Sequence, residues 1–286
     1  MATAERGDRL MFSQEFMRNA LLAGTFIALA CGVSGWFVVL RGQVFAGDAL
    51  SHVAFPGALA AAAAGVDERV GLFGATIAVG AGIGVLGQRS FAGSRGTGGA
   101  APAGDTAIGA VFTFVLGLGV FFLTLFSTSS GGGSGIQAAH TLFGSIFGLG
   151  AGEARLAAVL ALAAMGLTLV IARPLLFASV SPDLAAARGV PTRLLGIGFV
   201  VLLGVVAAEA TQAVGALLLL GLLAAPAAAA HRIAGNPYAG IVLAGLFAVV
   251  AMWVGLALGY VVPGVPPSTA IVTIAVGIYY VSTIVA

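Results

Sequence analysis

The chain has 286 residues, of which 60% are hydrophobic and only 8% are charged, and its mean hydropathy is +1.12. A soluble domain carries about a quarter charged residues, so this composition excludes an ordinary soluble protein and indicates an all-α, polytopic membrane protein. The net charge of +2 provides no basic surface for nucleic acid, and the single cysteine, Cys31, excludes an intramolecular disulfide.

Nine apolar runs have roughly the length of about 20 residues that a membrane-spanning helix needs. They occupy residues 19–40, 49–66, 70–87, 107–126, 154–172, 194–210, 213–230, 238–262 and 268–286. The stretch 136–150 is too short to span and is expected to form a re-entrant or interfacial helix. We therefore expect eight or nine spans in a single transmembrane domain, residues 17–286, after a polar tail at residues 1–16.

The arginines predict the orientation of these spans. If Arg41 is cytoplasmic, alternate crossing of the membrane puts six further arginines of the loops on the same side, and two, Arg69 and Arg155, on the other side together with the three arginines of the N-terminal tail. The six are Arg89, Arg95, Arg173, Arg188, Arg193 and Arg232. By the positive-inside rule, the N-terminus is expected outside and the C-terminus in the cytoplasm.

An acid and a histidine lie four residues apart in the stretch Gly47-Asp48-Ala49-Leu50-Ser51-His52. On a helix, Asp48 and His52 share one face, one turn apart. Carboxylate and imidazole are both ligands of first-row divalent metals, and such a pair is costly in a membrane unless it faces water, protein or an ion pathway. Two readings stay open: a metal site, or a helix cap by Asp48 after Gly47 with His52 bonded to a neighbouring carbonyl.

Four further residues in or near the apolar runs are weaker candidates. Glu209 could complete a metal site, move protons or reach the outer interface, and we favour an interface or gate role. His140 is expected near the outer surface, and His231 beside Arg232 is expected at the cytoplasmic interface. Pro226 is expected to kink or break its helix.

Residues 181–189 carry helix start and stop signals at their two ends, and these signals predict a short cytoplasmic helix. Ser181 suits the N-cap, and Asp183 in the first turn and Arg188 in the last turn both favour the helix dipole. Gly189 can adopt the left-handed conformation that ends a helix. This segment is either a well-capped surface loop or a helix that docks into a soluble partner.

Taken together, these features resemble the integral-membrane permease of zinc- and manganese-importing ABC transporters. The resemblance runs in collinear order from about residue 16 to the end of the chain. The stretches that carry it are Val38–Arg41 with Phe45–Gly57, Gly104–Gly109, Ser181–Pro191, and Val214–Leu218 with Ala225–Ala229 and Pro266–Thr269.

The resemblance implies a type II ABC importer permease that moves Zn²⁺ or Mn²⁺ into the cytoplasm across the bacterial plasma membrane. It implies that Asp48 and His52 bind the metal in transit, with no permanently bound cofactor. It also implies a permease homodimer, an extracytoplasmic metal-binding protein and two cytoplasmic ATPase subunits. The ATPases would contact the short helix, whose marker residues are Ser181, Asp183, Arg188 and Gly189. The chain is not expected to be an enzyme, since it has no Gly-x-x-x-x-Gly-Lys-[Ser/Thr] loop for ATP.

Two other classes of function compete with the importer. An ion-coupled secondary transporter predicts internal inverted repeats and no coupling helix. An intramembrane metalloenzyme needs about three protein ligands and a general base, whereas the three histidines here lie in three separate segments. One carboxylate and one imidazole suit Zn²⁺, Mn²⁺ and Fe²⁺ alike.

Overall fold

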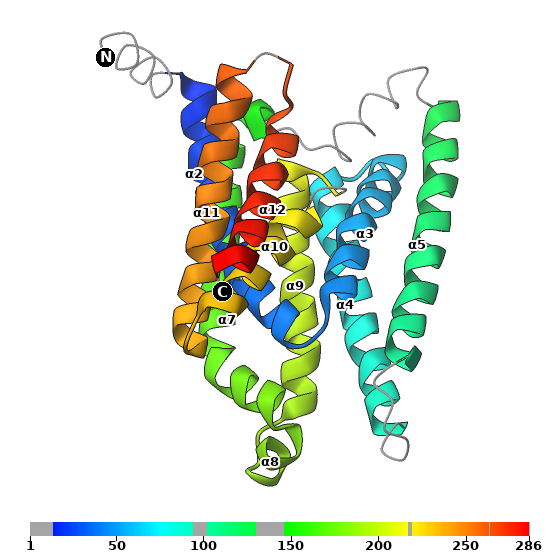
Figure 1. The fold of residues 1–286 in the computed structure, drawn as a ribbon. Coiled ribbons are helices and arrows are strands. Elements are labelled where there is room, and N and C mark those ends of the chain that lie inside the picture. Colours follow the sequence, from blue (N-terminus) through cyan, green and yellow to red (C-terminus); the bar gives the residue numbers. More distant parts are fainter. Residues whose placement is uncertain (1–13, 94–101, 130–145, 217–218, 263, 286) are drawn as a thin grey trace.

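The computed structural model describes residues 14–93, 102–129, 146–216, 219–262 and 264–285, and every regular element within those ranges is helical (Figure 1). The elements are α2 (Glu15–Leu40), α3 (Val44–Ala63), α4 (Glu68–Gly93), α5 (Pro102–Ser129), the 3₁₀ turn η1 (Ile146–Gly148), α7 (Ala151–Val180), α8 (Pro182–Ala187), α9 (Thr192–Val214), α10 (Leu219–Ile233), α11 (Pro237–Val261) and α12 (Pro267–Val285). In the described part of the chain, seven helices are long and apolar enough to cross a membrane, and α5 and α10 contain shorter apolar segments.

The prediction of an all-α bundle is confirmed, and eight of the nine apolar runs each overlap a single helix. Most helices differ from the predicted runs by a few residues at their ends, and the largest difference is at the end of α7, which reaches Val180 instead of residue 172. The second span begins at Val44 instead of residue 49, and the run 213–230 divides between two helices because the chain turns at Gly215, where φ is +95°. Of the predicted interfacial stretch 136–150, residues 136–145 lie outside the described residues, as do residues 1–13 of the polar tail.

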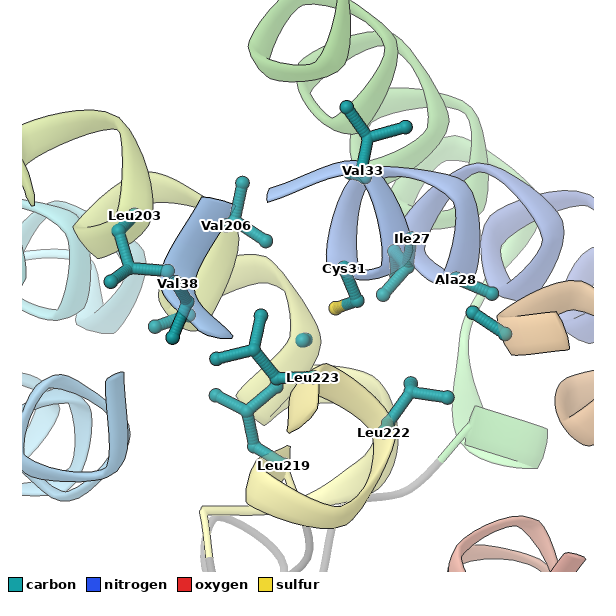
Figure 2. Packing of buried hydrophobic residues seen from close by; sticks show 14 of the residues in the cluster. Ile27, Ala28, Cys31, Val33, Val38, Leu203, Val206, Leu219, Leu222 and Leu223 are labelled. Carbon is teal, nitrogen blue, oxygen red and sulfur yellow. The ribbon is translucent and has the colours of Figure 1, made fainter. Parts of the chain in front are cut away.

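Helix α2 is the centre of the larger part of the bundle, since α7, α9, α10 and α11 all pack against it. Figure 2 shows Cys31 on its inner face, in an apolar cluster with Leu222 and Leu223 of α10. The approach of neighbouring helices is very close: a Cβ added at Gly32 would lie 2.5 Å from the carbonyl oxygen of Ala244 on α11. Small residues permit this contact, as is typical of helix packing in membranes.

Helices α3, α4 and α5 form a second part at one edge of the bundle (Figure 1). The backbones of α3 and α4 meet at two glycines, because a Cβ on Gly57 would lie 2.5 Å from the carbonyl oxygen of Gly71. Helix α9 connects this part to the rest by packing on α2, α3, α4 and α7. Its Ala208 belongs to a small apolar cluster with Ala54 and Ala58 of α3. Helix α3 is therefore held on two sides by close contacts of small residues.

Candidate functional site

Helix α3 begins directly after a tight turn at the end of α2. Gly42 has a φ of +64°, and its N–H donates to the carbonyl of Val39 at 3.1 Å. The N–H of Gln43 donates to the carbonyl of Val38 at 2.9 Å, which completes a Schellman motif. Gln43 is the N-cap of α3, so Asp48 lies in the second turn. The alternative reading of Asp48 as a helix cap is therefore wrong.

Asp48 and His52, which we call the α3 pair, lie on one face of α3 with His52 Nε2 and Asp48 Oδ1 3.9 Å apart. Two atoms bound to one ion at about 2.1 Å each lie at most about 4.2 Å apart, so both can bind the same ion with little rearrangement. The side chains are 27% and 19% exposed, respectively. The imidazole packs beside Phe112 of α5, with ring centroids 5.4 Å apart. Among the described residues, no carbonyl accepts a hydrogen bond from the His52 side chain.

In the part of the chain that the structure describes, the α3 pair is not joined by a further side chain of the usual metal-binding kinds. Across the described ranges, no group of three or more histidine, cysteine and acidic side chains could hold a metal ion. A catalytic zinc usually has about three protein ligands, so the α3 pair alone offers fewer groups than such a site uses.

Glu209 lies on α9 and faces a different part of the bundle from the α3 pair. Its side chain is 2% exposed and lines a small cavity with Arg69, Glu153 and Gln212. Arg69 and Glu153 form an ion pair of 2.7 Å at the mouth of this cavity. Because the neighbouring residue Ala208 packs on α3, Glu209 points toward α2, α4 and α7. Burial contradicts an exposed position for Glu209 at the outer interface, whereas its role as a gate stays a prediction.

The short helix α8 projects from one end of the bundle, where α7 bends toward it (Figure 1). Ser181 is its N-cap residue as predicted, although its side chain makes no capping hydrogen bond. Asp183 lies in the first turn as predicted, whereas Arg188 is the C-cap residue and not part of the last turn. Gly189 has a φ of +79°, and the N–H of the residue after it donates to the carbonyl of Ala185 at 3.0 Å. The predicted glycine stop is therefore confirmed.

Almost the whole of α8 faces outward. Ala185 is fully buried and attaches the helix to the bundle, while Leu184 beside it is 53% exposed. Asp183 and Arg188 are exposed at opposite ends of the helix. An apolar side chain between exposed charges on a projecting helix is typical of a protein-docking surface and favours the partner reading over the plain surface loop.

The remaining candidates have structural roles or lie beyond the described residues. His231 stacks on Trp36 of α2 with centroids 4.5 Å apart, and its Nε2 lies 2.9 Å from the Trp36 carbonyl oxygen. This contact joins α10 to α2, whereas Arg232 is exposed. Helix α10 continues through Pro226 without a break. His140 lies outside the described residues. Phe112 could not be identified from the sequence, because an aromatic residue in an apolar span carries no distinguishing signal.

Comparisons with known proteins agree with this architecture. The model of the ABC 3 transport family matches residues 13–286. The chain is 28% identical to the manganese transport system membrane protein MntC of Listeria innocua, over 93% of this chain and 89% of that protein. It is also 28% identical to the manganese import system permease protein ScaB of Streptococcus parasanguinis, over 86% of this chain and 82% of that protein.

Two solved structures are similar in fold. PsaBC from Streptococcus pneumoniae in complex with Fab superimposes with a TM-score of 0.81 and 28% identity, over 99% of this chain and 96% of that chain. An inward-facing metal-chelate type ABC transporter has a TM-score of 0.65 and 18% identity, over 94% of this chain and 86% of that chain, and supports the fold alone.

A family match over nearly the whole chain confirms the resemblance found in the sequence. It decides against the secondary-transporter and metalloenzyme alternatives, since the family consists of ABC transporter permeases. The chain is a multi-pass plasma-membrane protein and not an enzyme, and its family implies a separate ATPase and a solute-binding partner. The chain belongs to the ABC 3 transport family, as the permease subunit of an ABC importer for a divalent transition metal.

Proposed function

We propose that this permease imports manganese and that the ion passes the α3 pair on its way to the cytoplasm. Support for manganese comes from the relatives MntC and ScaB, which are named for manganese transport and import. Support for the site comes from one observation, the 3.9 Å separation of a carboxylate oxygen and an imidazole nitrogen on one face of α3. Zinc and iron are the competing substrates, because both metals accept the same ligand types.

The chemistry of the α3 pair suits a transported ion. Asp48 supplies negative charge, which offsets the cost of bringing a dication into a low-dielectric region. His52 supplies a nitrogen ligand that binds divalent metals as the neutral imidazole. With two protein ligands and partly exposed side chains, the ion keeps part of its water shell, and release then needs no large structural change.

The complete importer in this proposal contains two permease copies, two ATPase subunits and an extracytoplasmic metal-binding protein. The ATPases dock on α8 through the surface around Ser181, Asp183, Arg188 and Gly189. The N-terminus lies outside and the C-terminus in the cytoplasm, which puts α8 on the cytoplasmic side. No cofactor is permanently bound, and the metal is the cargo.

Uptake by reconstituted vesicles tests the proposed function. We expect vesicles that contain the permease and its ATPase to accumulate radioactive Mn²⁺ only when ATP and the metal-binding protein are supplied. Excess unlabelled Mn²⁺ should compete more strongly than Zn²⁺ or Fe²⁺. Uptake driven by a proton or sodium gradient without the ATPase would contradict the importer, and stronger competition by Zn²⁺ or Fe²⁺ would contradict manganese as the substrate.

We expect Gly189→Val to weaken association of the ATPase about tenfold. The φ of Gly189 is +79°, and a β-branched residue held in that region is strained by about 1–3 kcal/mol. Because relief of this strain disturbs the end of α8, part of it is lost from the binding free energy. A loss of about 1.4 kcal/mol corresponds to a tenfold change in affinity. Titration of the ATPase onto the permease in nanodiscs measures the effect.

Gly198→Val is the matched control for this variant. Gly198 lies nearby on α9, is exposed, and has no atom within 4 Å of an added Cβ. Its valine variant should bind the ATPase with wild-type affinity. Equal affinities for the two variants would mean that the ATPase contacts another surface.

We expect Glu209→Gln to leave Mn²⁺ uptake within about twofold of wild type. The side chain faces α2, α4 and α7 and not the α3 pair, and the amide has the same shape as the carboxylate it replaces. The vesicle uptake assay measures this directly. A loss as large as that expected for an Asp48 variant would instead put Glu209 in the ion path.

A further inference from the structure

The side chain of Arg41 joins three helices at the end of the bundle from which α8 projects. Arg41 is the C-cap residue of α2. Its Nη1 donates to Ser179 Oγ on α7 at 3.1 Å, and its guanidinium carbon lies 5.9 Å from the ring centroid of Phe199 on α9. The Ser179 hydroxyl donates its own hydrogen to the carbonyl of Leu175 at 2.6 Å, so its oxygen is oriented to accept from Arg41.

The two partners of Arg41 flank α8 in the chain. Ser179 lies in the last turn of α7, just before α8 begins. Phe199 lies on α9, which follows α8 after a short connection, and its ring is fully buried. Arg41 therefore contacts both of the helices that connect α8 to the bundle. A displacement of α8 that moves either helix also moves the groups that hold Arg41.

On its other side, Arg41 is fixed to the start of α3. Its Nε donates to Gln43 Oε1 at 3.2 Å, and Gln43 is the N-cap of α3. The turn between α2 and α3 is closed by the Schellman hydrogen bonds around Gly42. Asp48 follows in the second turn of the same helix. A continuous series of contacts thus connects α8 to the α3 pair.

The groups that contact Arg41 are of a kind that would move together with its side chain. In the described part of the chain, no carboxylate pairs with Arg41, and neutral oxygens and a ring face hold the charge. Burial lowers the pKa of Arg41 from its ordinary value, since removal from water disfavours the charged form. Hydrogen bonds from a charged donor are stronger than neutral ones, while a buried charge that loses a partner is destabilised. The ends of α7 and α9 are therefore expected to follow Arg41 when it moves.

We propose that Arg41 is a positioning residue that transmits displacement of α8 to the start of α3 and hence to Asp48. This inference rests on the proposed function of α8 as the ATPase contact. It assigns a role to an arginine that otherwise only marks the end of α2. Its specific consequence is uncoupling: without Arg41 the ATPase docks and hydrolyses ATP, but fewer ions cross for each ATP.

The test compares Arg41→Met, Arg41→Lys and Ser179→Ala in the reconstituted importer. Methionine keeps an apolar stem and removes every donor, whereas lysine keeps the charge but lacks the fork that bonds two partners at once. We expect Arg41→Met to lower Mn²⁺ uptake per ATP about tenfold, with ATPase affinity within about twofold of wild type. Ser179→Ala should lower the ratio about threefold, and Arg41→Lys should restore part of it.

Arg173→Met is the matched control. Arg173 also lies on α7 but is exposed, so its loss should leave the ratio of ions to ATP unchanged. A wild-type ratio in Arg41→Met would overturn the inference, and so would a loss of ATPase affinity equal to the loss of uptake. If Arg41→Met does not yield folded protein, Ser179→Ala decides the question, because a wild-type ratio in that variant overturns the inference as well. Failure of the proposed function is distinct, since wild-type vesicles would then show no ATP-driven uptake.

Discussion

Asp48→Asn and His52→Gln are each expected to lower ATP-driven Mn²⁺ uptake at least about 100-fold, because loss of a group that only supports a metal ligand already costs about 10–100-fold. Asparagine keeps the shape of Asp48 but removes the negative charge that offsets the dication. Glutamine replaces the imidazole nitrogen with a weak amide ligand. In the described part of the chain no further histidine, cysteine or acid joins the α3 pair in a possible metal site, so neither loss has a replacement nearby.

The matched control for this prediction is Ser51→Ala. Ser51 lies between the two ligands on α3, and its hydroxyl donates to the backbone carbonyl of Asp48 at 2.6 Å. It is fully buried on another face of the helix. We expect Ser51→Ala to retain uptake within about twofold, since the Asp48 carbonyl already accepts a backbone hydrogen bond within the helix.

Uptake should be measured together with ATPase docking and metal binding. Broadening of the electron paramagnetic resonance of Mn²⁺ reports binding to the permease without transport. We expect the Asp48 and His52 variants to lose both binding and uptake while the ATPase still docks on α8. Wild-type uptake in both variants would remove the α3 pair from the ion path, whatever their effect on binding.

The part of the site that could be predicted from the sequence depends on local geometry. A spacing of four residues puts Asp48 and His52 on one helical face whatever the rest of the fold does, and the structure confirms it. The stop of α8 at Gly189 is likewise local. It needs only a glycine that can adopt the left-handed conformation and backbone carbonyls in the preceding turn that accept hydrogen bonds.

The part that could not be predicted depends on which faces of distant helices meet. Glu209 lies near the end of an apolar run, which is compatible with an exposed or a buried carboxylate. Its burial follows from the rotation of α9, which turns Ala208 toward α3 and Glu209 toward α4 and α7. The contact of His52 with Phe112 and that of Arg41 with Ser179 also join residues far apart in the chain. No period or cap signal in one helix encodes such a contact.

Gly57→Val is expected to lower the free energy of unfolding by about 3 kcal/mol, the upper part of the usual range for an overpacked contact. A Cβ at this position would lie 2.5 Å from the carbonyl oxygen of Gly71. That atom belongs to the backbone of α4, so it cannot move aside as a flexible side chain can. The helices α3 and α4 must separate, which also displaces the α3 pair. The midpoint of thermal unfolding in detergent should fall by about 6–12 °C.

Gly74→Val isolates the effect of the helix crossing from the effect of replacing a glycine. Gly74 lies one turn beyond Gly71 on α4, and an added Cβ there meets no atom within 4 Å. Since valine is slightly better than glycine inside a helix, this variant should unfold within about 2 °C of wild type or slightly above it.

Because Gly57 supports the α3 pair only through the position of α3, its variant should also lose Mn²⁺ uptake where Gly74→Val keeps it. Equal unfolding midpoints for the two variants would contradict a close backbone contact between α3 and α4, and the placement of the α3 pair would then need another explanation.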